Sequence, residues 1–117
     1  MEYLLGIDIG GTHVKGGIVT GTTGKMDQRT IVYEKIDAGG SATSIIKGIL
    51  RVITALKKGR SENEWRGIGI AIPGPFDYTR GIAAIHGVRK FDALFGLDLK
   101  EEIKRGCSLP VVFLNDA

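Results

Sequence analysis

The sequence predicts an α/β domain built on a mixed sheet, and three observations indicate this class. Two β-rich runs, 3–9 and 14–20, are joined by a Gly-Gly-Thr turn at 10–12, which is typical of an antiparallel hairpin. Apolar residues over 42–56 recur with helical spacing. This helix lies between strand-like runs, and a strand–helix–strand unit joins parallel neighbours by a right-handed crossover.

The outer part of the sheet and its covering helix follow the hairpin. A turn at 21–25 precedes a third strand at 26–36, whose mixed polarity is typical of an exposed outer strand. Ser41 is the expected N-cap of the helix, and Gly59 ends it. The apolar stripe of the helix consists of Ala42, Ile45, Ile46, Ile49, Leu50, Ile53 and Leu56.

The next strand, 66–72, is unusual because one face is isoleucine and the other is nearly bare backbone. The bare side predicts that something packs very closely on it. The Pro-Gly-Pro run at 73–75 ends this strand, and 76–85 predicts a loop or a small hairpin. Phe91 and Phe95, four residues apart, predict a helical turn that packs on the core, with a sugar-stacking platform as the less favoured alternative.

A second helix and a last strand complete the order of elements. Asp98 and Glu101 form a capping-box-like start for a helix over 99–105, and a buried strand follows at 111–114. The resulting order, three antiparallel strands and then α/β crossovers, matches the ribonuclease-H-like sheet. We therefore expect residues 1–117 to form a single domain of this class.

Composition excludes several kinds of protein. The net charge is +3, and the densest basic cluster, 57–60, lies at a helix end, so a solvated terminus is favoured over a nucleic-acid patch. The single cysteine, Cys107, excludes an internal disulfide and does not support a zinc site. No apolar run reaches membrane-spanning length and no signal-peptide pattern is present, which predicts a cytoplasmic protein without membrane partners.

The first hairpin carries the residues best suited to an anion. Gly10 and Gly11 can take positive φ and approach a ligand closely, and consecutive N–H groups in such a turn form a nest to which Thr12 adds a hydroxyl. Asp8, in an otherwise apolar strand, costs several kcal/mol unless it is paired, hydrated or metal-bound. Asp8 and Asp116 both lie near carboxyl ends of strands, where open α/β sheets bind ligands. A plain Gly-rich hairpin is the alternative.

Three motifs in order resemble the ROK family of bacterial sugar kinases and repressors, within the actin-like ATPase superfamily. Residues 6–15, Gly-Ile-Asp-Ile-Gly-Gly-Thr-His-Val-Lys, are similar to the family's first phosphate motif. The strand-plus-proline motif appears at 67–75. The Asn-Asp-Ala motif, 115–117, follows an apolar strand. Together they cover nearly the whole chain, as an N-terminal lobe of a kinase.

The resemblance implies roles for the sugar side of such a site. Asp116 would be the general base that removes a proton from a sugar hydroxyl as it attacks the γ-phosphate of ATP. Asn115 would hydrogen-bond sugar hydroxyls, and the backbone near Gly74 would line the pocket. His86 is a further candidate for that pocket, with a surface loop histidine as the alternative.

The resemblance also implies a nucleotide side. Gly10, Gly11, Thr12 and Lys15 would contact the phosphates of ATP. Asp8 would position Mg²⁺ through water. The substrates implied are a hexose or N-acetyl-hexosamine and a nucleotide, and a homodimer is left open.

Departures from the family pattern keep alternatives open. The family's second lobe, which supplies adenosine contacts and often a zinc site, is absent here, so this piece alone is expected to be inactive. Residues 85–90 replace a stretch that usually holds a sugar-contacting asparagine, which leaves the sugar unnamed. The motif starts at residue 6, without the repressors' preceding DNA-binding module. A non-catalytic sugar-binding or regulatory fragment is one alternative, and a ribonuclease-H-like nuclease is a less favoured one.

Overall fold

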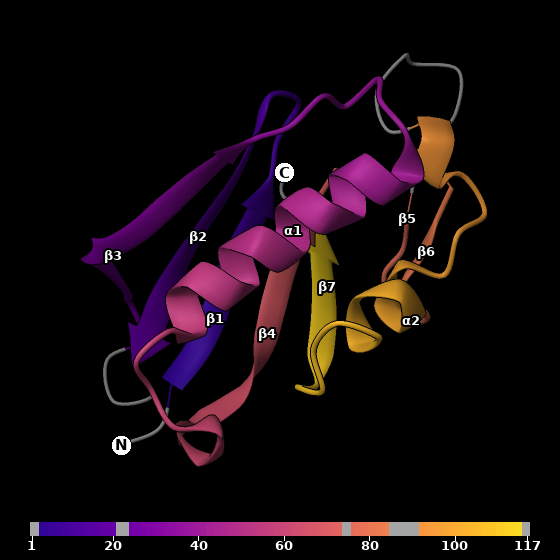
Figure 1. Ribbon diagram of the computed structural model, residues 1–117. Helices are drawn as coiled ribbons and strands as arrows, with labels where there is room; N and C mark the ends of the chain where they lie inside the picture. The colour runs from indigo at the N-terminus through magenta and orange to yellow at the C-terminus, as the bar shows by residue number, and fades with distance from the viewer. Residues whose placement is uncertain (1–2, 21–23, 74–75, 85–91, 116–117) are drawn as a thin grey trace.

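A five-stranded mixed sheet forms the centre of the molecule, in the order β3-β2-β1-β4-β7 (Figure 1). This computed structural model describes residues 3–20, 24–73, 76–84 and 92–115. The pairs β3–β2 and β2–β1 are antiparallel, whereas β1–β4 and β4–β7 are parallel. The predicted ribonuclease-H-like, actin-like ATPase arrangement is confirmed. The strands are β1 Tyr3–Ile9, β2 His13–Thr20, β3 Met26–Lys35, β4 Trp65–Ile72 and β7 Val111–Asn115.

Helix α1 (Ala42–Lys57) covers one face of the sheet (Figure 1). The Ser41 hydroxyl oxygen accepts the backbone N–H of Ser44 at 3.2 Å, and Gly59 takes the left-handed φ of +83° beyond the last turn. Close packing against β2 requires Gly16, because a Cβ there would lie 2.4 Å from Val52 Cγ1. The predicted helix, with its cap and its stop, is confirmed.

The remaining elements are short. They are single 3₁₀ turns at Glu62–Glu64 and Asp92–Leu94, the hairpin strands β5 Phe76–Asp77 and β6 Ile82–Ala83, and helix α2 Leu99–Lys104. Asp98 caps α2 by accepting the Glu101 N–H at 3.0 Å, as expected. Within the described ranges, no helix combines the length and apolar character needed to cross a bilayer.

The predicted small hairpin forms at β5–β6. The Asp77 carboxylate accepts one hydrogen bond from the backbone N–H of Arg80 and another from its guanidinium group. Both bonds, the backbone one most strongly, lower the pKa of the Asp77 carboxyl. Gly81 takes a φ of +76° and lies against Phe113 of β7, so the hairpin packs on the last strand of the main sheet.

The expected packing of Phe95 on the core is wrong. Its side chain is 57% exposed, and Leu94, which is fully buried, takes the core position instead. The chain forms a 3₁₀ turn there rather than an α-helical one, and Gly96 with a φ of +75° follows it. Phe91 lies outside the described residues.

None of the described helices covers the second face of the sheet, so the expected close packing on the bare side of β4 is found at Gly67 but not at Gly69. A Cβ at Gly69 would have no heavy atom of the described structure within 4 Å, and only Gly67 meets a close neighbour, the Pro110 carbonyl oxygen at 3.2 Å. A groove of about 610 Å³ runs over this face. Its lining includes small residues of β1 and β4 and the side chains of Leu4, Val19, Met26, Val112 and Leu114.

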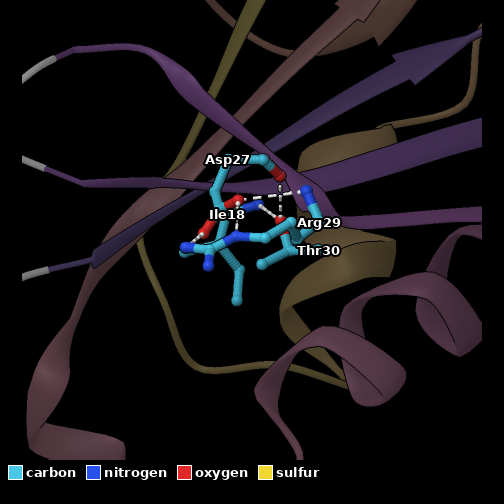
Figure 2. A network of polar contacts seen from close by, with 4 residues as sticks. All are labelled: Ile18, Asp27, Arg29 and Thr30. Atoms are coloured by element: carbon cyan, nitrogen blue, oxygen red, sulfur yellow. Dashed lines mark hydrogen bonds and ion pairs between the residues drawn. The ribbon is translucent and has the colours of Figure 1, made fainter.

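Strand β3 departs from a regular ladder beside β2. Gly16 pairs with Val32, but Ile18 pairs with Asp27, so one residue of β2 faces four of β3. Figure 2 shows how the gap is filled: the Ile18 N–H donates to Thr30 Oγ1 at 2.9 Å, and the Thr30 hydroxyl donates to the Asp27 carbonyl oxygen at 2.6 Å. The Arg29 side chain, with its backbone N–H, lowers the pKa of the Asp27 carboxyl.

Candidate functional site

Asp8 lies near the carboxyl end of β1 and points to the open face of the sheet. Its neighbours Ile7 and Ile9 are buried under α1, and strand alternation places Asp8 on the opposite side. The carboxylate is exposed and makes no hydrogen bond or ion pair with another described residue. The burial cost expected from its apolar strand does not arise, because the face it points to is uncovered.

The turn after β1 is held by two backbone hydrogen bonds. The Gly10 N–H donates to the His13 carbonyl oxygen at 2.9 Å, and the Ile36 N–H donates to the Thr12 carbonyl oxygen at 2.8 Å. Neither Gly10 nor Gly11 takes the left-handed φ that the sequence suggested. The expected nest therefore loses the Gly10 N–H, while the N–H groups of Gly11 and Thr12 have no partner among the described residues.

A contact between neighbouring side chains holds the Thr12 hydroxyl. Thr12 Oγ1 lies 2.9 Å from His13 Nδ1. The His13 ring in turn meets the Tyr33 ring of β3 edge-on, at 6.4 Å between centroids and an interplanar angle of 87°. His13 is exposed, yet Thr12 and Tyr33 both contact its ring.

Cationic side chains surround this turn on the open face. Lys15 of β2 stands directly between Asp8 of β1 and Tyr33 of β3 in one cross-sheet row. Lys35 stands opposite His13 in the next row, nearer the turn. The sequence reasoning missed Lys35 and Tyr33. The alternation of the third strand, combined with antiparallel pairing to the second, could have placed both on this face.

The carboxyl ends of the three parallel strands meet beside the turn. Asp8 pairs with Ala71 of β4, and Ile72 of β4 pairs with Asn115, the last residue of β7. The backbone of Asn115 is therefore one strand away from the end of β1. Chemically, this edge combines two lysines with a carboxylate and two N–H groups that have no partner among the described residues, which suits a phosphate-bearing ligand with a hydrated cation.

Three predicted site residues, Gly74, His86 and Asp116, lie outside the described residues. The structure thus brings together Asp8, the 10–12 turn, Lys15 and the backbone of Asn115. No group of three or more histidine, cysteine or carboxylate side chains gathers within 3–20, 24–73, 76–84 and 92–115. Cys107 is buried between the end of α2 and the start of β7, and serves as an apolar packing residue.

Solved structures with the same fold include kinases and a regulator. A polyphosphate/ATP-glucomannokinase from Arthrobacter sp. strain KM superposes with a TM-score of 0.81 at 24% identity, over 100% of this chain and 45% of its own. A ROK family glucokinase from Streptomyces griseus, in complex with glucose and AMPPNP, gives 0.72 at 26% identity, over 98% and 33%. A ROK family transcriptional regulator, homologous to the E. coli MLC protein, gives 0.72 at 20% identity, over 97% and 28%.

The chain thus spans less than half the length of these relatives. None of the curated proteins matches the sequence significantly. The family profile of ROK, in contrast, matches residues 4–117, which is nearly the whole chain. This match over nearly the whole length shows that the chain belongs to the ROK family.

Proposed function

We propose that this chain is the N-terminal lobe of an ATP-dependent sugar kinase that phosphorylates a hydroxyl of a hexose or N-acetyl-hexosamine. The observation that carries the proposal is the meeting of strand ends: the 10–12 turn after β1 lies across β4 from the end of β7. A phosphate held at the turn and a sugar held at the end of β7 would face each other at this edge. The glucose and AMPPNP complex of the Streptomyces griseus neighbour supports both ligand classes.

The proposed chemistry divides between the two strand ends. At the end of β7, Asp116 accepts the proton of the attacking sugar hydroxyl while Asn115 hydrogen-bonds neighbouring hydroxyls, and Gly74 and His86 line the pocket. Phosphoryl transfer depends on alignment and charge stabilisation rather than on covalent help from the protein. A base that holds the attacking hydroxyl oxygen in line with the γ-phosphate supplies that alignment.

The phosphate side would be built on β1 and β2. The N–H groups of Gly11 and Thr12 and the ammonium group of Lys15 contact the phosphates, beside Gly10 in the same turn. Asp8 fits a magnesium site reached through water, because its carboxylate is exposed and unpaired among the described residues. Bound Mg²⁺ would neutralise phosphate charge there.

The test is a coupled ADP-release screen on a two-lobed protein, in which this chain is followed by a second lobe of the kind that its longer relatives have. This is the two-lobed protein of the predictions below. The panel consists of common hexoses and their N-acetylated forms. We expect turnover with at least one of them. Silence across the panel from a folded protein would contradict the kinase proposal and favour a non-catalytic regulator, the class to which one neighbour of the same fold belongs.

The 117-residue chain by itself is expected to show no measurable kinase activity and no micromolar affinity for ATP. Its phosphate turn lies on an open face, so a bound nucleotide would remain in water without enclosing contacts. Isothermal titration calorimetry with Mg-ATP measures this directly. Micromolar binding would contradict the expectation.

Asp8→Asn in the two-lobed protein is expected to raise the KM for Mg-ATP while leaving the KM for sugar nearly unchanged. The amide keeps the shape but removes the charge that would hold the hydrated cation. Steady-state kinetics at several magnesium concentrations check this. Asp27→Asn is the control, because Asp27 forms an ion pair with Arg29 in the irregular stretch of β3 and has no role in the proposed site. Equal effects on both substrates would contradict the role of Asp8.

A further inference from the structure

The Thr12 hydroxyl cannot bind both His13 and a phosphate in every protonation state. A hydroxyl has one proton to donate, and the oxygens of a phosphate or sulfate dianion only accept. The 2.9 Å contact between Thr12 Oγ1 and His13 Nδ1 holds a single proton between the two atoms. When Nδ1 carries no proton, the Thr12 hydroxyl donates to it and has nothing left for an anion.

The reverse arrangement frees the hydroxyl. When Nδ1 is protonated, it donates to Thr12 Oγ1, and the Thr12 proton can point to an anion oxygen. From this geometry we infer that His13 is a positioning residue, which couples protonation of its Nδ1 to anion binding by the Thr12 hydroxyl. The inference rests on the proposed role of the 10–12 turn as the phosphate site.

The surroundings of His13 favour such coupling. On β3, Tyr33 meets the imidazole ring edge-on and Lys35 stands directly opposite it. On its own strand Lys15 points to the same face, as does Asp8 of β1, which is paired with Lys15. Asp37 follows Ile36, whose N–H donates to the Thr12 carbonyl oxygen. Among the described residues, Thr12 is the hydrogen-bond partner of Nδ1, so the Nδ1 proton and the direction of the Thr12 hydroxyl are linked.

Anion binding at the turn then depends on the Nδ1 proton of His13 rather than on the total charge around the turn. Replacing Thr12 with valine keeps His13 and both lysines but removes the hydroxyl. Replacing His13 with phenylalanine keeps a ring against Tyr33 but removes the nitrogen. Both positions are exposed, so neither change disturbs the core.

The experiment is NMR of the ¹⁵N-labelled 117-residue chain, titrated with sulfate, whose charge stays constant between pH 5.5 and 8. Long-range ¹H–¹⁵N correlations report whether His13 Nδ1 carries a proton, and the amides of Gly11 and Thr12 report binding. We expect sulfate to raise the Nδ1-protonated population and to bind roughly three- to fivefold more tightly at pH 5.5 than at pH 8. In Thr12→Val and His13→Phe this pH dependence should largely disappear, with the dispersed amide spectrum confirming that each variant is folded.

Two results would overturn the inference alone: sulfate shifts the Gly11 and Thr12 amides without changing Nδ1, or Thr12→Val keeps the full pH dependence. The second result would mean that His13 acts only as a charge. A different result bears on the proposed function as well. If sulfate at high concentration leaves both amides unmoved at every pH, the turn binds no anion, and both the phosphate role and the coupling are wrong.

Discussion

Replacing Asp116 with asparagine in the two-lobed kinase is expected to lower turnover by roughly 10²–10⁴, the range typical of losing a general base. Asparagine preserves the shape but cannot accept the proton of the sugar hydroxyl. The KM for sugar should change much less, because the amide still hydrogen-bonds the substrate. Asp116 directly follows β7, whose last residue is paired with the end of β4, beside the 10–12 turn.

The competing explanation is that Asp116 only caps a following helix. A cap is worth about 1 kcal/mol of stability and has no direct effect on chemistry. Asp98→Ala provides the matched control, since Asp98 is an N-cap in this fold and lies outside the proposed site. If Asp116→Asn behaves like Asp98→Ala, with a melting temperature a few degrees lower and turnover retained, the proposed mechanism is wrong.

Ile70→Ala is expected to lower the free energy of unfolding by about 2–5 kcal/mol, the usual cost of truncating a fully buried aliphatic side chain. Ile70 is completely buried on the inner strand β4, between Ile7 of β1 and Phe113 of β7. Because small domains are only about 5–15 kcal/mol stable, this loss is a large fraction of the total stability. Urea denaturation of the 117-residue chain measures the change.

The adjacent residue supplies the control. Gly69→Ala adds a methyl group on the open face, where no heavy atom of the described structure lies within 4 Å. Alanine restricts the unfolded chain, so this variant should be unchanged or up to about 1 kcal/mol more stable. A large loss of stability in Gly69→Ala would mean that the open face is covered in solution.

Local patterns in the sequence predicted most of the fold. The spacing of Ile45, Ile49 and Ile53 defines the buried side of α1, and Ser41 and Gly59 mark its ends, because capping and periodicity are properties of neighbouring residues. The chain order of hairpin, crossover and last strand then leaves few arrangements of a twisted sheet, and the observed one was predicted.

Features that depend on partners distant in the chain were not predictable in the same way. The bare side of β4 suggested a close neighbour, but glycine is equally compatible with open space, and only the tertiary structure distinguishes the two at Gly69. Phe95 had the right spacing for a buried helical turn, but Leu94 fills that space.

In the candidate site, too, the features set by neighbouring residues were predictable and those set by distant partners were not. Asp8, the turn and Lys15 were predicted from the motif, and the pairing of strands places them at one edge. The hydrogen bond that occupies the Gly10 N–H, and the approach of Tyr33 and Lys35 from β3, required the register of two strands. A composition rule for the turn could not predict them.

The irregular stretch of β3 also bears on association between molecules. Strand β3 spans ten residues at an edge of the sheet, and an uninterrupted edge of that length would be a template for a strand from another copy. The four residues opposite Gly17 break the run of evenly spaced N–H and C=O groups, and an ion pair between Arg29 and Asp27 places charge on the break. A neighbouring strand would find evenly spaced hydrogen-bond partners only in the two short runs that flank the break, 26–27 and 32–35, which opposes the growth of sheets from one molecule to the next.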